Sequence, residues 1–363
     1  MNNAYKPIIL REGTYSAKDI DNLKKRYRIW EERDIYEAQL KEYFEITHAY
    51  LLGSPNYDAE LNRYIKSVLS VDRLKGDWAY FPWSGLLVHL IRQEEYFALR
   101  TNRNRNLITA EEQHLLSESC IGIIGLSVGS NVATTLVYSG IGKVFKLAEF
   151  DVLETTNLNR IRARIDQIYI KKIDLTARQI YEIDPFAEII TFEEGLSKDL
   201  LTSFLTHEPK PKVIFEIIDG FEMKIHLRAL AREAGIPVIM ITNLGDRVLI
   251  DVERYDLNRN LEFFNGRAGR LPYEMLAHPD ITTAEKHKYA VDLAGTSHIP
   301  PRALESVAEI GKTLVGRPQL ASTVMTATGF SVYLAKKILL GHELPSRSWL
   351  IDLDKLFDKE NSL

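Results

Sequence analysis

The chain has 363 residues, of which 45% are hydrophobic and 26% are charged, and its formal net charge is -4 at pH 7. These are the values of an ordinary soluble globular protein, large enough for two domains or one enlarged domain. The acidic balance argues against general nucleic-acid binding, which needs a basic surface, although a local basic patch for a tRNA stays open.

The N-terminus and the cysteine content favour a cytoplasmic protein. The opening residues, MNNAYKPIILREGTYS, lack the long apolar core of a signal peptide. No apolar run approaches the roughly 20 residues of a membrane span, so no membrane contact is expected. The single cysteine, Cys120, excludes an internal disulfide and a zinc site made only of cysteines.

Residues 1–99 are predicted to form a helical N-terminal extension used for recognition or dimerisation. Ser16 is suited to cap a helix in which Ile20, Leu23, Tyr27 and Trp30 recur at helical spacing. Further helices are expected over 35–52 and from residue 54 onward.

An aromatic run, GDWAYFPWSGLLVHLI, follows these helices. Pro82 is expected near the start of a helix over 86–96. Trp78, Tyr80, Phe81 and Trp83 are interpreted as core rather than as a ligand-stacking surface, because a helical appendage needs an apolar face to dock.

From Cys120 the pattern changes to alternating strands and helices within residues 100–255. Buried strands are predicted over 121–124, 144–147, 189–192, 213–218 and 238–241, and helices over 131–139, 173–183, 200–205 and 223–234. This alternation predicts an α/β fold, a doubly wound Rossmann-like sheet that is mainly parallel. Residues 247–255 are expected to add a more amphipathic, antiparallel strand.

Residues 256–363 are expected to hold an irregular crossover segment and a closing helix. The stretch 256–317 is polar and rich in turn signals such as Asn265-Gly266 and Pro300-Pro301. The last long helix is predicted over 322–340, ended by Gly341.

A glycine turn follows the first Rossmann strand. Gly125 ends the strand and Gly129 opens the helix, so backbone N–H groups at the helix start can face a phosphate. Ser127 and Ser130 stand where the G-x-G-x-x-G pattern has glycines, so the turn alone is also compatible with a tight connection that binds nothing.

Polar residues behind this turn fit a nucleotide triphosphate. Glu149, about 20 residues after the turn, is placed to accept hydrogen bonds from ribose hydroxyls, and Asp151 follows on the same side. The long crossover then carries an amide and three cations, which suit the charge of a reacting triphosphate: Asn157, Arg160, Arg162 and Lys172.

Asp219 ends the apolar strand FEIID, at the edge where open α/β sheets bind ligands. A carboxylate beside phosphates suits Mg²⁺, which prefers oxygen ligands. The same residue is also compatible with a structural role at the start of the next helix.

The order and spacing of five motifs resemble those of the ThiF/MoeB/HesA adenylyltransferases, relatives of the ubiquitin-activating enzymes. The motifs are GLSVGS, LAEFD, NLNR, Lys172 before EIDP, and IID. The resemblance covers about half the chain. It implies that Glu149 binds the ribose and that Asn157 and Arg160 bind phosphates. It also implies that Lys172 binds the α- and β-phosphates and that Asp219 binds Mg²⁺. RPQLASTVMTATGFSVYLAKKILLG is similar to the family's closing helix.

The resemblance also implies a homodimer in which an arginine reaches the ATP of the partner subunit. Arg103 stands at a similar place, with Arg105 as the alternative. The sequence departs from the family in its depleted glycine pattern, in the absence of Cys-x-x-Cys zinc pairs and in the absence of a cysteine after the Rossmann strands. A thioester relay is therefore not expected.

These features predict an ATP- and Mg²⁺-dependent adenylyltransferase that converts a substrate carboxylate into an acyl-adenylate. The acceptor stays open among a small ubiquitin-like protein, a peptide, a small molecule and a modified tRNA. Two alternatives are a non-catalytic nucleotide-binding scaffold or sensor, favoured by the lost glycines, and an NAD- or FAD-binding oxidoreductase. The oxidoreductase leaves Arg160, Lys172 and Asp219 without a role.

Overall fold

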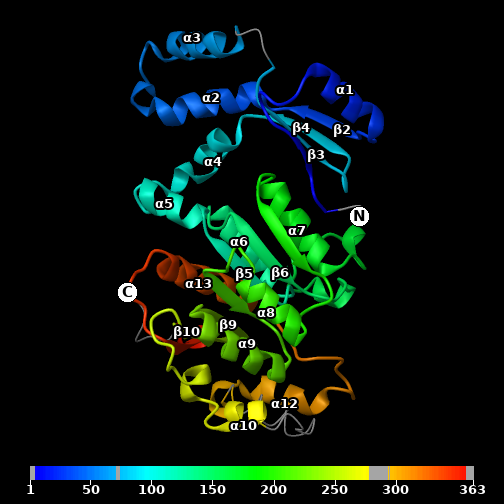
Figure 1. Ribbon diagram of the computed structural model, residues 1–363, viewed down its shortest axis with the longest axis vertical. Coiled ribbons are helices and arrows are strands. Elements are labelled where there is room, and N and C mark those ends of the chain that lie inside the picture. The colour runs from blue at the N-terminus through cyan, green and yellow to red at the C-terminus, as the bar shows by residue number, and fades with distance from the viewer. Residues whose placement is uncertain (1–4, 71–73, 278–292, 294, 357–363) are drawn as a thin grey trace. The chain divides into compact units, whose positions relative to one another are not determined.

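The computed structural model describes residues 5–70, 74–277, 293 and 295–356 (Figure 1), and the chain divides into two compact units. Unit 1 comprises Met1–Gln113, Val137–Gly140 and Ala177–Ala187, and unit 2 comprises His114–Leu136, Ile141–Thr176 and Glu188–Leu363. The finer division at residues 99 and 255 stays a prediction.

Unit 1 combines helices with a four-stranded sheet of order β1-β3-β4-β2. Its strands are β1 (Ile8–Leu10), β2 (Glu31–Asp34), β3 (Asp77–Phe81) and β4 (Leu86–Leu90), of which β2 and β4 are parallel and the other neighbours antiparallel. Its helices are α1 (Ala17–Arg26), α2 (Tyr36–Thr47), α3 (Tyr57–Leu69) and α4 (Gln93–Thr101), with short 3-10 turns η1 (Ala49–Leu51) and η2 (Asn102–Asn104).

The purely helical character expected of this region is therefore wrong. Residues 86–90 form strand β4, and helix α4 begins only at Gln93. Tyr80 and Leu87 are paired across β3 and β4 and buried in one small core, while Phe81 is buried on the other side of β3. Because both faces of β3 are covered, its sequence shows no polar alternation that would distinguish it from a buried helix.

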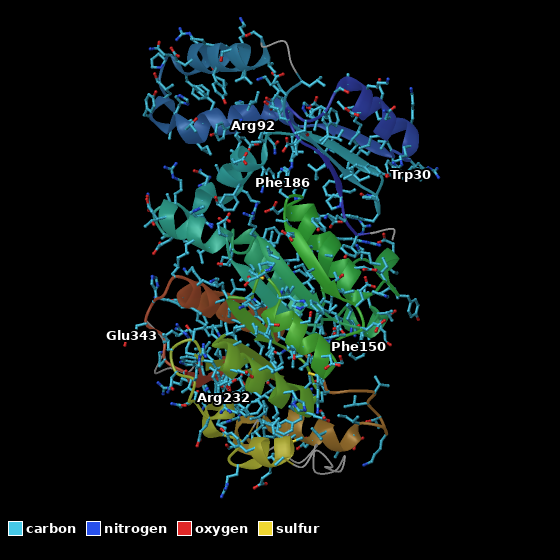
Figure 2. The ribbon with its side chains drawn as sticks, viewed as in Figure 1. Trp30, Arg92, Phe150, Phe186, Arg232 and Glu343 are labelled. Atoms are coloured by element: carbon cyan, nitrogen blue, oxygen red, sulfur yellow. The ribbon has the colours of Figure 1, made fainter. Side chains whose placement is uncertain are left out.

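The start of the first helix is as predicted, but its end is earlier. Ser16 caps α1, and its Oγ donates to Asp19 at 2.7 Å. The helix ends at Arg26, so Trp30 lies beyond it and is exposed (Figure 2). The guanidinium of Arg28 lies 3.6 Å from the centroid of the Trp30 ring, which accounts for the tolerated exposure.

Unit 2 is built on a seven-stranded sheet of order β11-β10-β9-β8-β5-β6-β7. Its strands are β5 (Cys120–Ile124), β6 (Val144–Ala148), β7 (Glu188–Phe192), β8 (Val213–Glu216), β9 (Val238–Leu244), β10 (Arg247–Glu253) and β11 (Arg347–Asp352). β5 to β9 are mutually parallel, whereas β10 and β11 are antiparallel to their neighbours. The predicted doubly wound α/β sheet and its antiparallel strand β10 are confirmed.

The order of the parallel strands is that of a Rossmann fold. Chain connections run from β5 outward through β6 to β7 and then return to β8 and β9 on the other side. β5 and β8 are hydrogen-bonded neighbours, so the connections leaving their carboxyl ends diverge. This is the topological switch point, where open α/β sheets bind ligands.

Helices in or bordering unit 2 are α5 (Ala110–Ser117), α6 (Gly129–Tyr138), α7 (Lys172–Ile183), α8 (Lys198–Thr206), α9 (Phe221–Ala234), α10 (Leu271–Ala277), α12 (Pro301–Glu309), α13 (Ala321–Leu339) and α14 (Leu353–Leu356). Short 3-10 turns are η3 (Thr155–Asn157), η4 (Ile165–Gln167), η5 (Phe263–Gly266) and η6 (Thr296–His298). The region 256–317 is thus less irregular than expected, although 278–292 and 294 lie outside the described residues. Among the described residues, no helix is both long and apolar enough to cross a bilayer.

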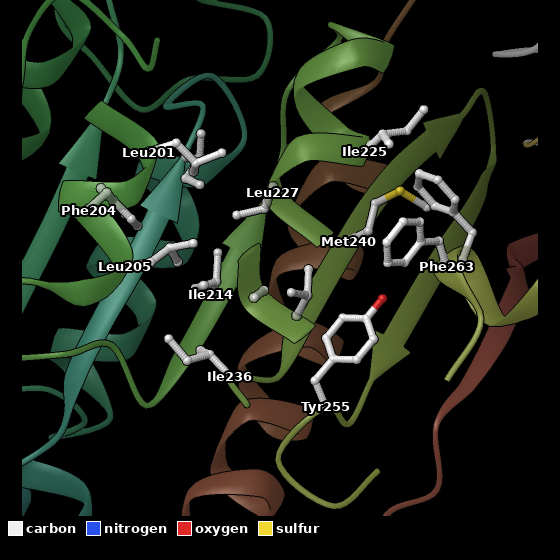
Figure 3. Close-up of a cluster of buried hydrophobic side chains, with 14 of the residues drawn as sticks. Leu201, Phe204, Leu205, Ile214, Ile225, Leu227, Ile236, Met240, Tyr255 and Phe263 are labelled. Carbon is white, nitrogen blue, oxygen red and sulfur yellow. The ribbon is translucent and has the colours of Figure 1, made fainter. Parts of the chain in front are cut away.

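The core near the switch point lies between α8, α9 and strands β8 and β9 (Figure 3). Phe204 and Leu205 of α8 pack with Ile214 of β8, and Met240 of β9 joins the same cluster. α13 contacts β8, β9 and β10 and lies behind the strands in this view. The strand ends that carry the candidate site are therefore held by a continuous apolar core.

A buried charge network lies beside this core. Arg228 of α9 is fully buried and forms ion pairs with Glu216 of β8 at 3.0 Å and with Glu253 of β10 at 2.8 Å. Lys224 adds a 2.6 Å ion pair to Glu216, and the Tyr255 hydroxyl donates to Glu253 at 2.6 Å. Because Glu216 also accepts from the backbone N–H of residue 218 at 3.2 Å, the network fixes the segment that leads to Asp219.

Candidate nucleotide site at the switch point

The glycine turn after β5 packs directly against the chain leaving β8. Gly125 has a φ of +90° and donates its N–H to the carbonyl of Ala148 at 3.0 Å. A Cβ added to Gly125 would lie 2.2 Å from the carbonyl oxygen of Ile217. Glycine is therefore required here by the backbone conformation and by the close approach of the two strand ends.

Glu149 connects the glycine turn to the end of β6. Its buried carboxylate accepts hydrogen bonds from the N–H groups of Leu126 at 2.9 Å, Phe150 at 2.9 Å and Asp151 at 3.1 Å. The Phe150 ring beside it is exposed (Figure 2). A carboxylate has about four acceptor positions, so this arrangement leaves room for one further donor.

Lys172, the first residue of α7, is paired with Asp151. The Lys172 Nζ lies 2.8 Å from the Asp151 Oδ2, and the Lys172 N–H donates to the Asp151 carbonyl at 2.9 Å. The lysine side chain is 9% exposed, whereas that of Asp151 is 50% exposed. Asp151 thus holds the ammonium group, whose position is fixed by the start of the helix.

The Asn-Leu-Asn-Arg turn is held by its own side chains. The buried Asn157 Oδ1 accepts from the Glu154 N–H at 3.1 Å, so this oxygen closes the turn. The Arg160 Nη1 donates to the Asn159 Oδ1 at 2.8 Å and to the Thr156 carbonyl at 3.2 Å. Burial lowers the pKa of Arg160, and the charge of Asp219 opposes that effect.

Three buried polar atoms around this turn lack a hydrogen-bond partner among the described residues: Ser127 Oγ, Asn131 Oδ1 and Arg160 Nε. They belong together, because the Asn131 Nδ2 donates to the Arg160 carbonyl at 3.0 Å and Ser127 lies one turn before Asn131. They are three of thirteen such side-chain atoms among the described residues, and they are distinguished by lying near one another, where a polar ligand would give them partners. Their position beside the glycine turn fits the polar parts of a nucleotide.

Asp219 follows directly after Ile218, three residues beyond the end of β8 rather than at the last residue of the strand, and its side chain is accessible to solvent. Its side chain is 89% exposed and forms an ion pair with Arg317. It also interacts electrostatically with Arg160 and Lys224. The structure thus places Asp219 within electrostatic range of Arg160 and adds Arg317 from the segment between α12 and α13.

The remaining predicted residues lie elsewhere or have other contacts. Arg162 is exposed, and its Nη2 lies 3.4 Å from the Met325 sulfur. Arg103 lies in η2 of unit 1 and is exposed, as is Arg105, the alternative. A Cβ added to Gly129 would lie 2.9 Å from the Ile123 side chain, so this glycine serves helix–strand packing.

Two site residues were not singled out from the sequence. Asn131 lies in α6 directly after the glycine turn, and its signal was an amide at the start of an otherwise apolar helix, SNVATTLV. Arg317 opens the segment that resembles the family's closing helix, but nothing in its local sequence pointed toward Asp219.

The single carboxylate at this site, Asp219, suits a metal ion that is bound together with a nucleotide rather than a metal site formed by the protein alone. Across the part of the chain that the structure describes, no group of three or more His, Cys, Asp or Glu side chains could hold an ion. Mg²⁺ is commonly bound by one or two carboxylates together with substrate phosphates and water. Asp219 can provide such a carboxylate, because its side chain is exposed at the strand end.

Fold and site together define a Rossmann protein with a candidate nucleotide site at its switch point. The sequence profile of the ThiF family matches residues 101–356, which is more than half of the chain. The chain therefore belongs to the ThiF family, which contains adenylyltransferase-like proteins, and the predicted family membership is confirmed.

Two curated relatives illustrate the range of this similarity. "Uncharacterized protein MT1398" of Mycobacterium tuberculosis is 34% identical over 282 residues, covering 78% of this chain and 38% of the relative. The tRNA threonylcarbamoyladenosine dehydratase of Bacillus subtilis is 27% identical over 158 residues, covering 43% of this chain and 60% of the relative. The chain thus spans less than two thirds of the length of each of these relatives.

Among solved structures, the tRNA N6-threonylcarbamoyladenosine dehydratase of E. coli in complex with AMP shares 18% identity with this chain. The alignment covers 67% of this chain and 95% of that structure, with a TM-score of 0.49.

Proposed function

We propose that this chain is an ATP- and Mg²⁺-dependent adenylyltransferase that activates a substrate carboxylate. The observation that carries the proposal is the set of orphaned polar atoms at the switch point, Ser127 Oγ, Asn131 Oδ1 and Arg160 Nε, beside an exposed strand-end carboxylate. A phosphate would accept hydrogen bonds from the Ser127 Oγ and the Arg160 Nε, a hydroxyl or amino group of the nucleotide would donate to the Asn131 Oδ1, and the metal would use the carboxylate.

Each predicted residue has a role consistent with its contacts. Glu149 would accept a ribose hydroxyl at its remaining acceptor position, next to three backbone donors. Arg160 and Lys172 would stabilise negative charge on the α-phosphate and the leaving pyrophosphate. Asn157 would position phosphate through its amide nitrogen, and Arg162 would add positive charge at the rim.

In the proposed reaction, a carboxylate oxygen of the substrate attacks the α-phosphorus of ATP. A new oxygen–phosphorus bond forms, the bond from the α-phosphorus to the bridging oxygen breaks, and pyrophosphate leaves with that electron pair. Mg²⁺, when bound, would neutralise phosphate charge beside Asp219. The residues of the chain act by fixing the phosphates in line and by stabilising the developing charge.

A thioester step is not part of the proposal. Cys120 is buried in β5, where burial raises the pKa of its thiol to about 11. Its Sγ lies 3.3 Å from the carbonyl of Pro209, so the thiol is held as a structural group. A thiol of such high pKa forms little thiolate at neutral pH and is a poor nucleophile.

The acceptor is proposed to carry a carboxylate, as a peptide, a small ubiquitin-like protein, a small molecule or a modified tRNA. Matching relatives include proteins named tRNA threonylcarbamoyladenosine dehydratase and ubiquitin-like modifier-activating enzyme 5, the latter from Drosophila willistoni. A homodimer in which the exposed Arg103 reaches the ATP of the partner subunit belongs to the same proposal.

A non-catalytic nucleotide-binding scaffold is the second candidate. It is favoured by the glycine turn, where Ser127 and Ser130 stand in place of glycines, and by the arginine that pairs with Asp219. Both candidates bind ATP, and only the adenylyltransferase turns it over.

Nucleotide binding tests the proposed site directly. By isothermal titration calorimetry in Mg²⁺, we expect the chain to bind ATP and to show no binding of NAD. Arg160→Gln is expected to weaken ATP binding by about 10- to 100-fold, because a charge-assisted contact to phosphate is lost. Arg164→Gln, an exposed neighbour that pairs with Asp166, is the matched control and should bind as the native chain does. Binding of NAD in preference to ATP would refute the assignment.

A further inference from the structure

Arg317 is held at the candidate site by two separate contacts of its segment. Its guanidinium is paired with the Asp219 carboxylate, and the carbonyl of Gln319, two residues later, accepts a hydrogen bond from the Asn159 Nδ2 at 2.8 Å. Asn159 in turn accepts from the Arg160 Nη1 at 2.8 Å. The segment before α13 is therefore tied to the turn that presents Arg160.

The charges around Asp219 leave a positive excess. Asp219 interacts with Arg160, Arg317 and Lys224, and Lys224 is already committed to the buried Glu216. One carboxylate thus faces two arginines on the exposed side of the site. Two guanidinium groups beside an exposed strand end favour a polyanion, because arginine binds phosphate oxygens in a forked geometry.

The ion pair between Arg317 and Asp219 is weak enough for another cation to replace Arg317 at the carboxylate. The side chains are 53% and 89% exposed, and ion pairs between solvent-exposed groups contribute little stability. A divalent cation arriving with a nucleotide would compete with Arg317 for the same carboxylate, and it carries the larger charge. Arg317 would then be released next to the phosphates that carry the metal.

From this geometry we propose that Arg317 is a polyphosphate-binding residue that pairs with Asp219 only while the site holds no nucleotide. When the metal–nucleotide complex binds, Asp219 turns to the metal and Arg317 turns to the phosphates. The inference rests on the proposed function, since it requires that the site takes a nucleoside triphosphate.

Mg²⁺–ATP binding to the full chain tests the phosphate contact, measured by titration calorimetry. Arg317→Gln is expected to weaken Mg²⁺–ATP binding about 10-fold or more, and Arg317→Lys to restore part of it, because a lysine keeps the charge but not the fork. The affinity for adenosine, measured as a competitor, should not change. Lys312→Gln removes the same charge from the same exposed segment and should bind ATP as the native chain does.

The exchange itself is tested without metal, in EDTA. Asp219→Asn releases Arg317 and is expected to strengthen binding of metal-free ATP about 10-fold, and adding Arg317→Gln should remove that gain. A gain that persists in the double variant would show that only the negative charge of Asp219 mattered. That result would overturn the exchange.

The outcomes separate this inference from the proposed function. If the native chain binds ATP and Arg317→Gln binds it equally well, Arg317 is a structural partner of Asp219 and only this inference fails. An equal loss of ATP affinity in Lys312→Gln would also overturn it, because the loss would then come from the lower positive charge of the segment and not from a contact of Arg317. If the native chain binds no ATP, the proposed function fails first.

Discussion

Replacing Asp219 by alanine is expected to abolish ATP–pyrophosphate exchange while leaving the fold intact. The proposed reaction needs a carboxylate for the metal beside the phosphates, and loss of one group that stabilises transition-state charge costs about 100- to 1,000-fold in rate. Because the Asp219 side chain is 89% exposed, its removal leaves no cavity. Exchange of labelled pyrophosphate into ATP would be measured with a mixture of cellular peptides and small proteins as acceptors.

The matched control is Asp246→Ala, which removes another exposed aspartate from the turn between β9 and β10. This variant should keep native exchange. Circular dichroism and the midpoint of thermal unfolding should be native in both variants. Unchanged exchange in Asp219→Ala would remove the strand-end carboxylate from the mechanism.

Arg228→Ala is expected to give a large loss of stability, about 3–5 kcal/mol in the free energy of unfolding. The arginine is fully buried and pairs with Glu216 and Glu253, so its removal leaves the buried Glu253 without its counter-charge and Glu216 with Lys224 alone. Its guanidinium also lies 3.7 Å from the centroid of the Phe264 ring, and that contact is lost as well. The measurement is urea denaturation followed by circular dichroism.

Arg232→Ala is the control for this variant, because Arg232 lies one turn further along α9, is only partly buried and stacks on the rings of Phe263 and Tyr273. It should cost about 1 kcal/mol or less. Arg228→Met with Glu253→Gln should be more stable than Arg228→Ala, since the unpaired buried charge is then removed. Equal stability of Arg228→Ala and Arg232→Ala would mean that the network does not support the sheet.

Much of unit 2 could be predicted from the sequence because its signals are local and strong. Buried parallel strands give short apolar runs, and the helices between them show the helical period, so the Rossmann order follows from their alternation. Strand β11 was missed because it pairs with β10 almost a hundred residues earlier in the chain. Such a pairing leaves no mark on the sequence nearby.

Unit 1 was harder to predict for a physical reason. Strands β3 and β4 bury side chains on both faces, so their aromatic and aliphatic residues show neither alternation nor a turn signal stronger than Ser84-Gly85. Residues of the site were found where they follow strand ends, as Glu149 and Asp219 do. The pairing of Arg317 with Asp219 joins residues far apart in the chain, and only the fold could reveal it.

The attack of a carboxylate on the α-phosphorus is tested most directly by an isotope label. An acceptor mixture whose carboxylates carry oxygen-18 is incubated with ATP, Mg²⁺ and the chain, and hydroxylamine is added to capture the activated acyl group. The AMP released is then analysed by mass spectrometry. The proposed reaction predicts AMP that carries one oxygen-18 atom, because the carboxylate oxygen stays on phosphorus when the acyl group leaves. AMP without the label, or bound ATP that no acceptor fraction converts, would contradict carboxylate adenylation.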